Sequence, residues 1–353
     1  MSIKSVAIDG VQFGGGAPVR VESMLKTRLD DVEGCVRELE SLRNAGCELV
    51  RVAFPDVALE SKLAELVERS RIPLMADIHF SHKYALAAID AGCRSIRINP
   101  GNMSGKEGLM EVLRAARANR VVIRIGSNGG SLDNRTLEAC DGDRSLALFR
   151  AVESQLLSLQ EVGFEDIILS AKSSSVRDTV AANLMLAQKY PYPLHVGITE
   201  AGPGMDGAVK SAVGLGMLLS QGVGDTMRVS LTGPSVQEIG VAYTILRSLD
   251  IRRKGVEIIS CPTCGRRRVE VVDLVERVRA ILDGLPEKLP DGTTVAVMGC
   301  EVNGPKEAAG ADIGIAGTQA GYVMFCKGEV VASGSIENLE SALRGELEKL
   351  FER

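Results

Sequence analysis

Five positively charged side chains recur at one kind of position in the first 250 residues. Each lies near the end of a short, β-branched stretch in which polar and apolar residues alternate. The five are Arg51, Arg97, Arg124, Lys172 and Arg228. Because side chains alternate along a strand, the polar members of one stretch face the same side. Clustered cations repel one another and lose hydration, so we expect an anion among them. A guanidinium group can donate two parallel hydrogen bonds to phosphate oxygens, so a diphosphate is the anion that best fits this set of residues.

Other polar residues share these strand ends and could take part in chemistry. His79 and His195 can act as neutral acids or bases, or as oriented hydrogen-bond donors. Glu200, on a Gly-rich loop, can exchange a proton or pair with an arginine. Asp77 and Ser230 occupy the same kind of position. A structural set of arginine–carboxylate pairs that holds the strands together is the alternative for any single residue.

Three cysteines in the last hundred residues have the spacing of a metal site. Cys261-Pro-Thr-Cys264 follows a predicted strand, and Cys300 follows another strand 36 residues later. A C-x-x-C turn presents two thiolates to one centre, and the spacing leaves a redox dithiol, a structural zinc and an iron–sulfur cluster open. Candidates for a fourth ligand are Glu301, Glu307 and Cys326. The remaining cysteines have no partner spacing and are expected to be buried apolar residues. They are Cys35, Cys47, Cys93 and Cys140.

Alternating strand and helix patterns place the charged residues on a (β/α)8 TIM barrel. We expect strands at 19–23, 48–53, 74–79, 95–99, 121–126, 166–172, 194–199 and 226–230. Helical periodicity predicts helices at 30–45, 59–70, 82–91, 106–118, 144–162, 176–189, 206–219 and 236–249. Barrel enzymes place their chemistry at the carboxyl ends of the strands, where the cations lie. The segment 5–14 predicts a hairpin that plugs the other end.

The composition changes after residue 249, which predicts a second, smaller α/β domain. The charged segment 251–255 is the expected linker between a barrel at 1–250 and a domain at 256–353 that carries the cysteine set. In that domain we expect strands at 256–260, 293–298 and near 312–316. We also expect helices at 269–285 and 336–351, and a hairpin around Lys327-Gly328.

Composition excludes several classes of protein. The 353 residues are 45% hydrophobic and 25% charged, which is typical of a globular protein. A net charge of −5, 3% aromatic residues and no tryptophan argue against nucleic-acid binding. No apolar run approaches the roughly 18 residues of a membrane span. The first residues lack a secretory signal. We therefore expect a cytoplasmic protein with no membrane partner.

The chain resembles the bacterial 4-hydroxy-3-methylbut-2-enyl diphosphate synthases, iron–sulfur enzymes of the methylerythritol phosphate route to isoprenoids. Short segments in both predicted domains carry the resemblance, in order along the chain. They are ADIHF (76–80), RINPGN (97–102), RIGSN (124–128), LHVGITEAG (194–202), GDTMRVSLT (224–232), ISCPTCGR (259–266), MGCEVNGPKEA (298–308) and DIGIAGT (312–318).

The resemblance implies a reaction, a cofactor and partners. The substrate would be 2-C-methyl-D-erythritol 2,4-cyclodiphosphate, which two electrons open and dehydroxylate to 4-hydroxy-3-methylbut-2-enyl diphosphate. A [4Fe-4S] cluster would be held by Cys261, Cys264, Cys300 and Glu307. Flavodoxin or ferredoxin would supply the electrons. The family forms homodimers in which the cluster domain of one subunit closes the barrel of its partner.

Matching motif positions imply roles for the barrel residues. The substrate-binding set is Arg51, Arg97, Arg124, Asn128, Lys172, His195, Arg228 and Ser230. The catalytic set is Asp77, His79 and Glu200. The chain also departs from the usual pattern of the family. Glu22 and Leu25-Lys26 stand where Gln and Thr-Asn are usual, Ser127 where Val is common, and Lys306 where Gly is common.

Two other functions fit part of the pattern. A non-redox TIM-barrel transferase that binds a pterin or a phosphate ester, with a structural zinc domain, would turn over without a reductant. A non-catalytic protein that binds a phosphate ligand would show tight binding and no turnover.

Overall fold

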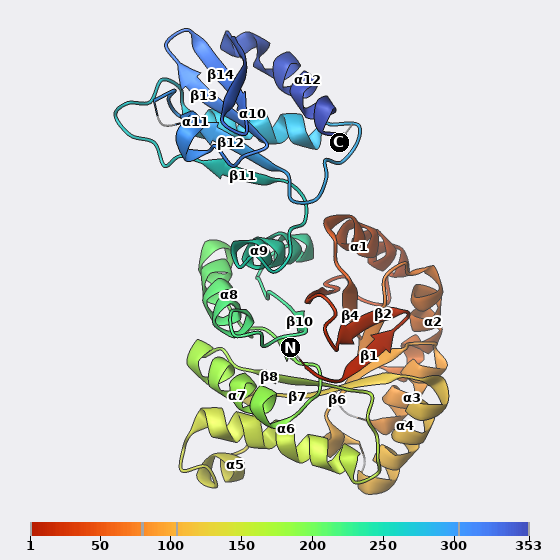
Figure 1. The fold of residues 1–353 in the computed structure, drawn as a ribbon. Coiled ribbons are helices and arrows are strands. Elements are labelled where there is room, and N and C mark those ends of the chain that lie inside the picture. The colour runs from red at the N-terminus through yellow and green to blue at the C-terminus, as the bar shows by residue number, and fades with distance from the viewer. Residues whose placement is uncertain (1, 79–80, 104, 303, 352–353) are drawn as a thin grey trace. The chain divides into compact units, whose positions relative to one another are not determined.

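The computed structural model describes residues 2–78, 81–103, 105–302 and 304–351. The chain folds as two compact units, Met1–Arg252 and Arg253–Arg353. Figure 1 shows the helices of the first unit around its strands, and a sheet with helices in the second unit. Among the described residues, no helix combines the length and the apolar character that crossing a membrane requires.

The first unit is a barrel of parallel strands. The strands are β3 (Arg20–Met24), β4 (Leu49–Ala53), β5 (Leu74–Asp77), β6 (Ser95–Ile98), β7 (Val122–Asn128), β8 (Ile167–Lys172), β9 (His195–Val196) and β10 (Thr226–Met227). They form one sheet in the order β8-β7-β6-β5-β4-β3-β10-β9. A parallel bridge between Leu169 and Leu194 joins the two ends of this order. The predicted barrel architecture is therefore confirmed.

Helices follow the barrel strands along the chain. They are α1 (Val32–Ala45), α2 (Glu60–Arg69), α3 (His82–Asp90), α4 (Gly105–Asn119), α6 (Arg144–Gln160), α7 (Val176–Lys189), α8 (Gly204–Leu219) and α9 (Ser235–Ser248). Short 3-10 turns are η1 (Val57–Leu59), η2 (Pro100–Asn102) and η3 (Gly129–Ser131). The sequence does not predict α5 (Asn134–Glu138), because five residues are too few to show a helical period.

Local hydrogen bonds fix where several helices begin and end. The Asp31 carboxylate accepts from the Gly34 N–H at the start of α1, and the Ser175 hydroxyl accepts from the Asp178 N–H at the start of α7. At the end of α1, Gly46 has a φ of 99°, in the left-handed region that glycine adopts without a Cβ clash. Gly46 therefore ends α1 immediately after Ala45, at the end predicted for this helix.

Two barrel strands are shorter than the sequence predicts. β9 and β10 hold two residues each, whereas the expected strands span 194–199 and 226–230. Beyond Val196, the backbone N–H of Thr199 donates to the Ser173 carbonyl at 3.3 Å, so this segment bonds to the loop that follows β8. The polar residues that follow β9 and β10 therefore lie on loops.

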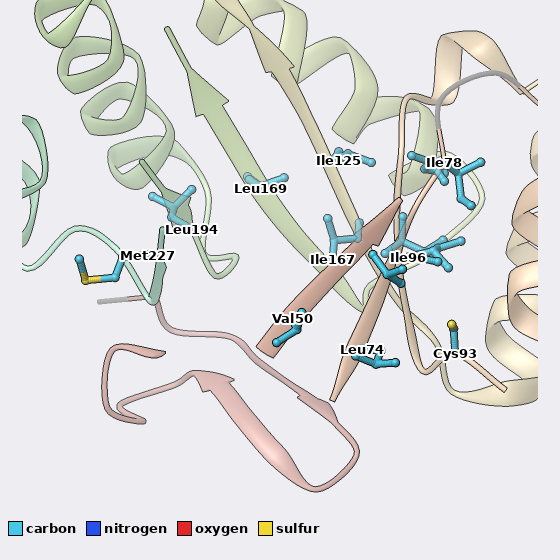
Figure 2. Packing of buried hydrophobic residues seen from close by; sticks show 14 of the residues in the cluster. Val50, Leu74, Ile78, Cys93, Ile96, Ile125, Ile167, Leu169, Leu194 and Met227 are labelled. Carbon is cyan, nitrogen blue, oxygen red and sulfur yellow. The ribbon is translucent and has the colours of Figure 1, made fainter. Parts of the chain in front are cut away.

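Buried apolar side chains hold the barrel together. Val50, Leu74, Ile96 and Leu169 come from four strands and belong to one cluster, which also contains Cys93 (Figure 2). A second cluster closes the amino end of the barrel. There the hairpin of β1 (Ser5–Ile8) and β2 (Val11–Gly14) packs against the first residues of several barrel strands. Its members are Val6, Ile8, Phe13, Leu49, Met75, Val122 and Ile168. The predicted plug is confirmed.

The described residues of the second unit form a five-stranded sheet with two longer helices and one short helix. Its strands are β11 (Glu257–Ser260), β12 (Thr294–Met298), β13 (Ile313–Thr318), β14 (Gly321–Cys326) and β15 (Glu329–Gly334), in that order. The helices are α10 (Val271–Asp283), α11 (Gly304–Glu307) and α12 (Leu339–Phe351), the last preceded by η4 (Ile336–Asn338). β11, β12 and β13 are parallel, and the turn at Lys327-Gly328 joins antiparallel β14 and β15 as predicted.

Candidate active site

A cavity of about 280 Å³ opens at the carboxyl ends of the barrel strands. Parallel register aligns its charged residues, because Asp77 on β5 lies opposite Arg97 on β6, which lies opposite Arg124 on β7. Asn128 and Lys172 are likewise partners at the ends of β7 and β8. The lining includes Arg51, Asp77, Arg97, Arg124, Asn128, Lys172, Arg228 and Ser230. The structure thus brings together most of the barrel residues that the sequence singles out.

Asp77 forms ion pairs with two of the cavity arginines. Its Oδ2 lies 3.5 Å from Arg51 Nε, and its Oδ1 lies 3.5 Å from Arg97 Nη1. Burial, which Asp77 offsets only in part, lowers the pKa of Arg51 to about 10, and the charges of Arg124 and Arg228 act in the same direction. Burial also lowers the pKa of Arg97. Both guanidinium groups remain charged at neutral pH.

Glu22 is a buried partner of Arg124 that sequence reasoning did not place in the site. Arg124 Nη1 lies 2.5 Å from Glu22 Oε2, and both side chains are almost wholly inaccessible to solvent. Burial alone would raise the pKa of the Glu22 carboxyl. The charge and hydrogen bond of Arg124, with the charges of Arg51 and Lys172, outweigh burial and lower it. Glu22 therefore stays ionised inside the barrel.

Glu238 on α9 is a second carboxylate that the sequence did not reveal. It lies 3.2 Å from Arg228 Nε and 3.2 Å from Lys26 Nζ, and it accepts from the Ser23 hydroxyl at 2.9 Å. Lys26 also donates to the carbonyls of Leu231 and Gly233. The signal that could have found Glu238 is its position on the buried face of an amphipathic helix, where an unpaired charge is not stable.

Lys172 and His195 form a close pair between β8 and β9. Lys172 Nζ lies 2.6 Å from His195 Nε2, and the His195 ring is fully buried. Burial, reinforced by Arg124 and Arg51, lowers the pKa of Lys172 well below its usual range. Burial and the neighbouring Lys172 likewise lower the pKa of His195, so the imidazole is neutral at physiological pH. His195 is behind Lys172 and is not part of the cavity lining among the described residues.

The charges around this cavity do not balance. The cations Arg51, Arg97, Arg124, Lys172, Arg228 and Lys26 face the carboxylates Asp77, Glu22 and Glu238. Six positive groups against three negative ones leave a surplus of positive charge when all are ionised. Structural ion pairs with the three carboxylates, the alternative interpretation, account for only some of these six cations. A buried surplus of positive charge is a favourable site for a bound anion.

The structure does not place two of the predicted catalytic residues in the cavity lining, for different reasons. His79 lies outside the described residues. Glu200 is exposed on the loop after β9, at a φ of 52°, and is absent from the lining among the described residues. Its placement follows from the short β9, because the chain leaves the sheet four residues before Glu200.

The cysteine set lies at the ends of two adjacent parallel strands of the second unit. Cys261 follows β11, Cys300 follows β12, and Ser260 is the register partner of Val297. The Gly299 N–H donates to Cys261 Sγ at 3.1 Å. Cys264 is exposed, and Glu307 is exposed on α11. The strands therefore bring Cys261 and Cys300 to the same edge of the sheet.

The donor chemistry of this edge fits an iron–sulfur cluster. Among the described residues, no three His, Cys, Asp or Glu side chains converge closely enough for a single metal ion. A cluster takes its thiolates at separate irons, so its ligands need not converge on one point. Soft thiolates and a backbone N–H directed at sulfur are the usual surroundings of such a cluster. The residues present therefore fit the group.

The four cysteines without partner spacing are buried, as the sequence predicts. They are Cys35, Cys47, Cys93 and Cys140. Burial raises the pKa of Cys47 and of Cys93 to about 12, so these thiols stay protonated. Cys326, at the end of β14, packs against the apolar core of the second unit. None of these five lies at the strand edge that carries Cys261 and Cys300.

Both units match models of one protein family. The GcpE TIM-barrel domain matches residues 3–243, and the GcpE protein C-terminal domain matches residues 257–349. The chain belongs to the GcpE family. The family resemblance inferred from the motifs is thereby confirmed, as is a barrel followed by a smaller domain.

Several relatives in this family carry the name 4-hydroxy-3-methylbut-2-en-1-yl diphosphate synthase (flavodoxin). The protein of Thermodesulfovibrio yellowstonii is 45% identical over 346 residues, which cover 98% of each chain. That of Maridesulfovibrio salexigens is 48% identical and covers 93% of this chain and 90% of the relative. Among solved structures, a dihydropteroate synthase from Xanthomonas albilineans gives a TM-score of 0.49 at 15% identity over 71% of this chain and 99% of that chain, from which nothing further follows.

Proposed function

We propose that this GcpE-family chain converts 2-C-methyl-D-erythritol 2,4-cyclodiphosphate to 4-hydroxy-3-methylbut-2-enyl diphosphate. Two electrons and one proton enter, and one water leaves. The observation that carries the proposal is a buried surplus of positive charge at the barrel mouth, in a chain that also has the cysteine set and full-length relatives of that name. No observation favours the pterin- or phosphate-ester-binding transferase.

The cavity cations would hold the diphosphate. Arg51, Arg97 and Arg124 come from neighbouring strands and can offer paired N–H donors to phosphate oxygens. The remaining binding residues are Asn128, Lys172, Arg228 and Ser230, with His195 acting through Lys172. The same positive charge would bind the ring-opened product as well, because its diphosphate carries more negative charge than the cyclic substrate.

Three residues are proposed for proton transfer and orientation. Asp77 borders the cavity and fixes the directions of Arg51 and Arg97. Glu200, on the loop after β9, is the proposed proton donor, and it would have to approach the cavity by movement of that loop. His79 is proposed from its motif position alone.

We propose that Cys261, Cys264, Cys300 and Glu307 hold a [4Fe-4S] cluster. When bound, such a cluster supplies electrons one at a time. The Gly299 N–H donates to Cys261 Sγ, and Lys306 precedes Glu307 in the sequence; both would favour added negative charge on the cluster. The name of the relatives supports flavodoxin as the electron donor, and ferredoxin is the alternative donor.

We further propose a homodimer in the cytoplasm, where the thiols stay reduced. In the dimer, the cluster domain of one subunit would serve the barrel of its partner. Supporting a dimer, α8 exposes an apolar stripe at four-residue spacing. Its members are Met205, Val209, Val213 and Met217, with exposed fractions of 77%, 53%, 51% and 47%. Such a stripe is characteristic of a surface that a second chain covers.

The cofactor is tested by purifying the protein with oxygen excluded. We expect a brown protein with about four iron and four sulfide per chain and an electron paramagnetic resonance signal on reduction. Colourless protein with stoichiometric zinc would instead support the transferase. The variant C300S should lose iron and colour, whereas C140S, a buried cysteine of the barrel unit, should keep both.

A further inference from the structure

Three buried groups contact one another in succession beside the cavity. They are Glu22 on β3, His195 on β9, and Lys172 at the end of β8, and Lys172 lines the cavity. Glu22 Oε2 lies 3.4 Å from His195 Nδ1, and His195 Nε2 lies 2.6 Å from Lys172 Nζ. The Glu22 and His195 side chains are fully buried, so water does not compete for these contacts.

The chemistry of the three groups selects one position for the imidazole proton. A lysine ammonium has only donors, so a ring nitrogen beside it must be the unprotonated acceptor. An ionised carboxylate has only acceptors. It therefore attracts a ring nitrogen that carries a proton and repels one that carries a lone pair. Both contacts therefore place the proton of His195 on Nδ1, towards Glu22, and leave Nε2 free to accept from Lys172.

Buried polar atoms around Glu22 that lack hydrogen-bond partners also support a proton on His195 Nδ1. In the described part of the chain, Glu22 Oε1, Arg124 Nη2 and His195 Nδ1 are buried and have no hydrogen-bond partner. The Nδ1 contact to Glu22 is therefore electrostatic at 3.4 Å, with room to shorten. Buried polar atoms without partners are costly, and a small rotation of the ring towards Glu22 Oε2 would satisfy His195 Nδ1.

Lys172 needs this support because its other neighbours oppose its charge. Burial, Arg124 on β7, Arg51 on β4 and Arg228 after β10 all favour loss of its proton. Glu22 raises the pKa of Lys172, and Asp77 and Arg97 complete the charged groups at the cavity. An uncharged Lys172 would weaken the cavity for any anion.

We propose that Glu22 is a positioning residue for the anion cavity. It holds the proton of His195 on Nδ1, and the free Nε2 in turn keeps the ammonium of Lys172 charged and directed at the ligand. The inference deepens the proposed function, because it concerns how the same site holds a diphosphate.

The test reads the imidazole directly in the full chain, prepared without oxygen and without ligand. The sequence has three histidines, so two-bond proton–nitrogen correlation spectra can be assigned with the variants H82Q and H79Q. We expect wild-type His195 to carry its proton on Nδ1. In E22Q, which keeps the size of the side chain and removes the charge, we expect a substantial Nε2–H population. The control E48Q removes a carboxylate paired with Arg20 and Arg252 and should leave the His195 signals unchanged.

A second measurement follows the charge of Lys172. Calorimetric titration with inorganic pyrophosphate should show affinity falling as pH rises through the pKa of Lys172. Because Glu22 raises that pKa, the fall in E22Q should begin at a lower pH than in the wild type, and this pH midpoint is the readout. The protonation of pyrophosphate itself is the same in both titrations. A structural role for Glu22 through Arg124 alone would not move the tautomer.

Two results would overturn the proposal. One is a wild-type His195 with its proton on Nε2, which decides the question even if E22Q does not fold. The other is a folded E22Q with an unchanged tautomer and an unchanged pH midpoint. Failure of the proposed function is a separate outcome, because the tautomer is read without ligand. A wild-type chain that binds no pyrophosphate would contradict the anion site whatever the tautomer.

Discussion

Removal of the Asp77 carboxylate should separate anion binding from catalysis. Asp77 contacts both Arg51 and Arg97 at 3.5 Å, so in the cavity it competes with a bound anion for these guanidinium groups. In D77N this competitor is neutral, while the arginines keep their positions on β4 and β6. We expect D77N to bind inorganic pyrophosphate more tightly and to lose turnover of the cyclodiphosphate, because Asp77 is a proposed catalytic group.

The size of the effect follows from the cavity. A volume of about 280 Å³ corresponds to a radius of roughly 4 Å, so a bound anion lies within about 5–8 Å of the Asp77 carboxylate. With an effective dielectric constant of about 20, Coulomb's law gives roughly 2–3 kcal/mol per unit of anion charge at that distance. Salt and rearrangement of the arginines reduce this, so we expect about 10- to 100-fold tighter binding.

Calorimetry at low and high salt provides the assay. The gain in D77N should shrink as salt rises, because ions screen the cavity charges in part. E48Q, which removes a carboxylate paired with Arg20 and Arg252, is the matched control and should bind as the wild type does. A folded D77N that binds pyrophosphate no more tightly than the wild type would refute the assignment of Asp77 as a competitor for the cavity arginines.

Three further predictions concern stability and assembly. R124M leaves the Glu22 carboxylate buried without its partner and should lower the free energy of unfolding by about 3–5 kcal/mol, whereas R124M/E22Q should recover much of that loss in denaturant titrations. Burial alone would raise the pKa of Glu153, but Lys189 and Tyr190 lower it to about 2. The stability that ionised Glu153 contributes is thus complete above about pH 4.5 and is lost as pH falls towards 2. Between these pH values, the melting temperature of E153Q should therefore fall less than that of the wild type. V213E places a charge in the apolar stripe of α8 and should convert the proposed dimer to a monomer in analytical ultracentrifugation, with the barrel still folded.

The sequence predicted the barrel and most of the cavity because both depend on local periodicity. Alternation along β6 and β7 places Arg97 and Arg124 on one face, and the parallel register then sets them side by side. The cysteine motif similarly depends on two strands that end at the same edge of a sheet. Such features can be predicted from the types of a few residues that are close together in the sequence.

Partners from distant parts of the chain could not be predicted in this way. Glu22 and Arg124 are 102 residues apart, and Ser23 and Glu238 are 215 apart, so no local pattern links them. Which carboxylate neutralises which arginine depends on the closure of the barrel. The conformations of loops could not be predicted from local patterns either. Strand β9 ends earlier than its sequence pattern suggests, and Glu200 is therefore exposed on a loop.

Electron counting during turnover tests the central claim most directly. The oxygen-free protein, reduced with dithionite and mixed with 2-C-methyl-D-erythritol 2,4-cyclodiphosphate, should form 4-hydroxy-3-methylbut-2-enyl diphosphate with two electrons consumed per product. Product formed without any reductant, or iron-loaded protein that binds the cyclodiphosphate and consumes no electrons, would contradict the account.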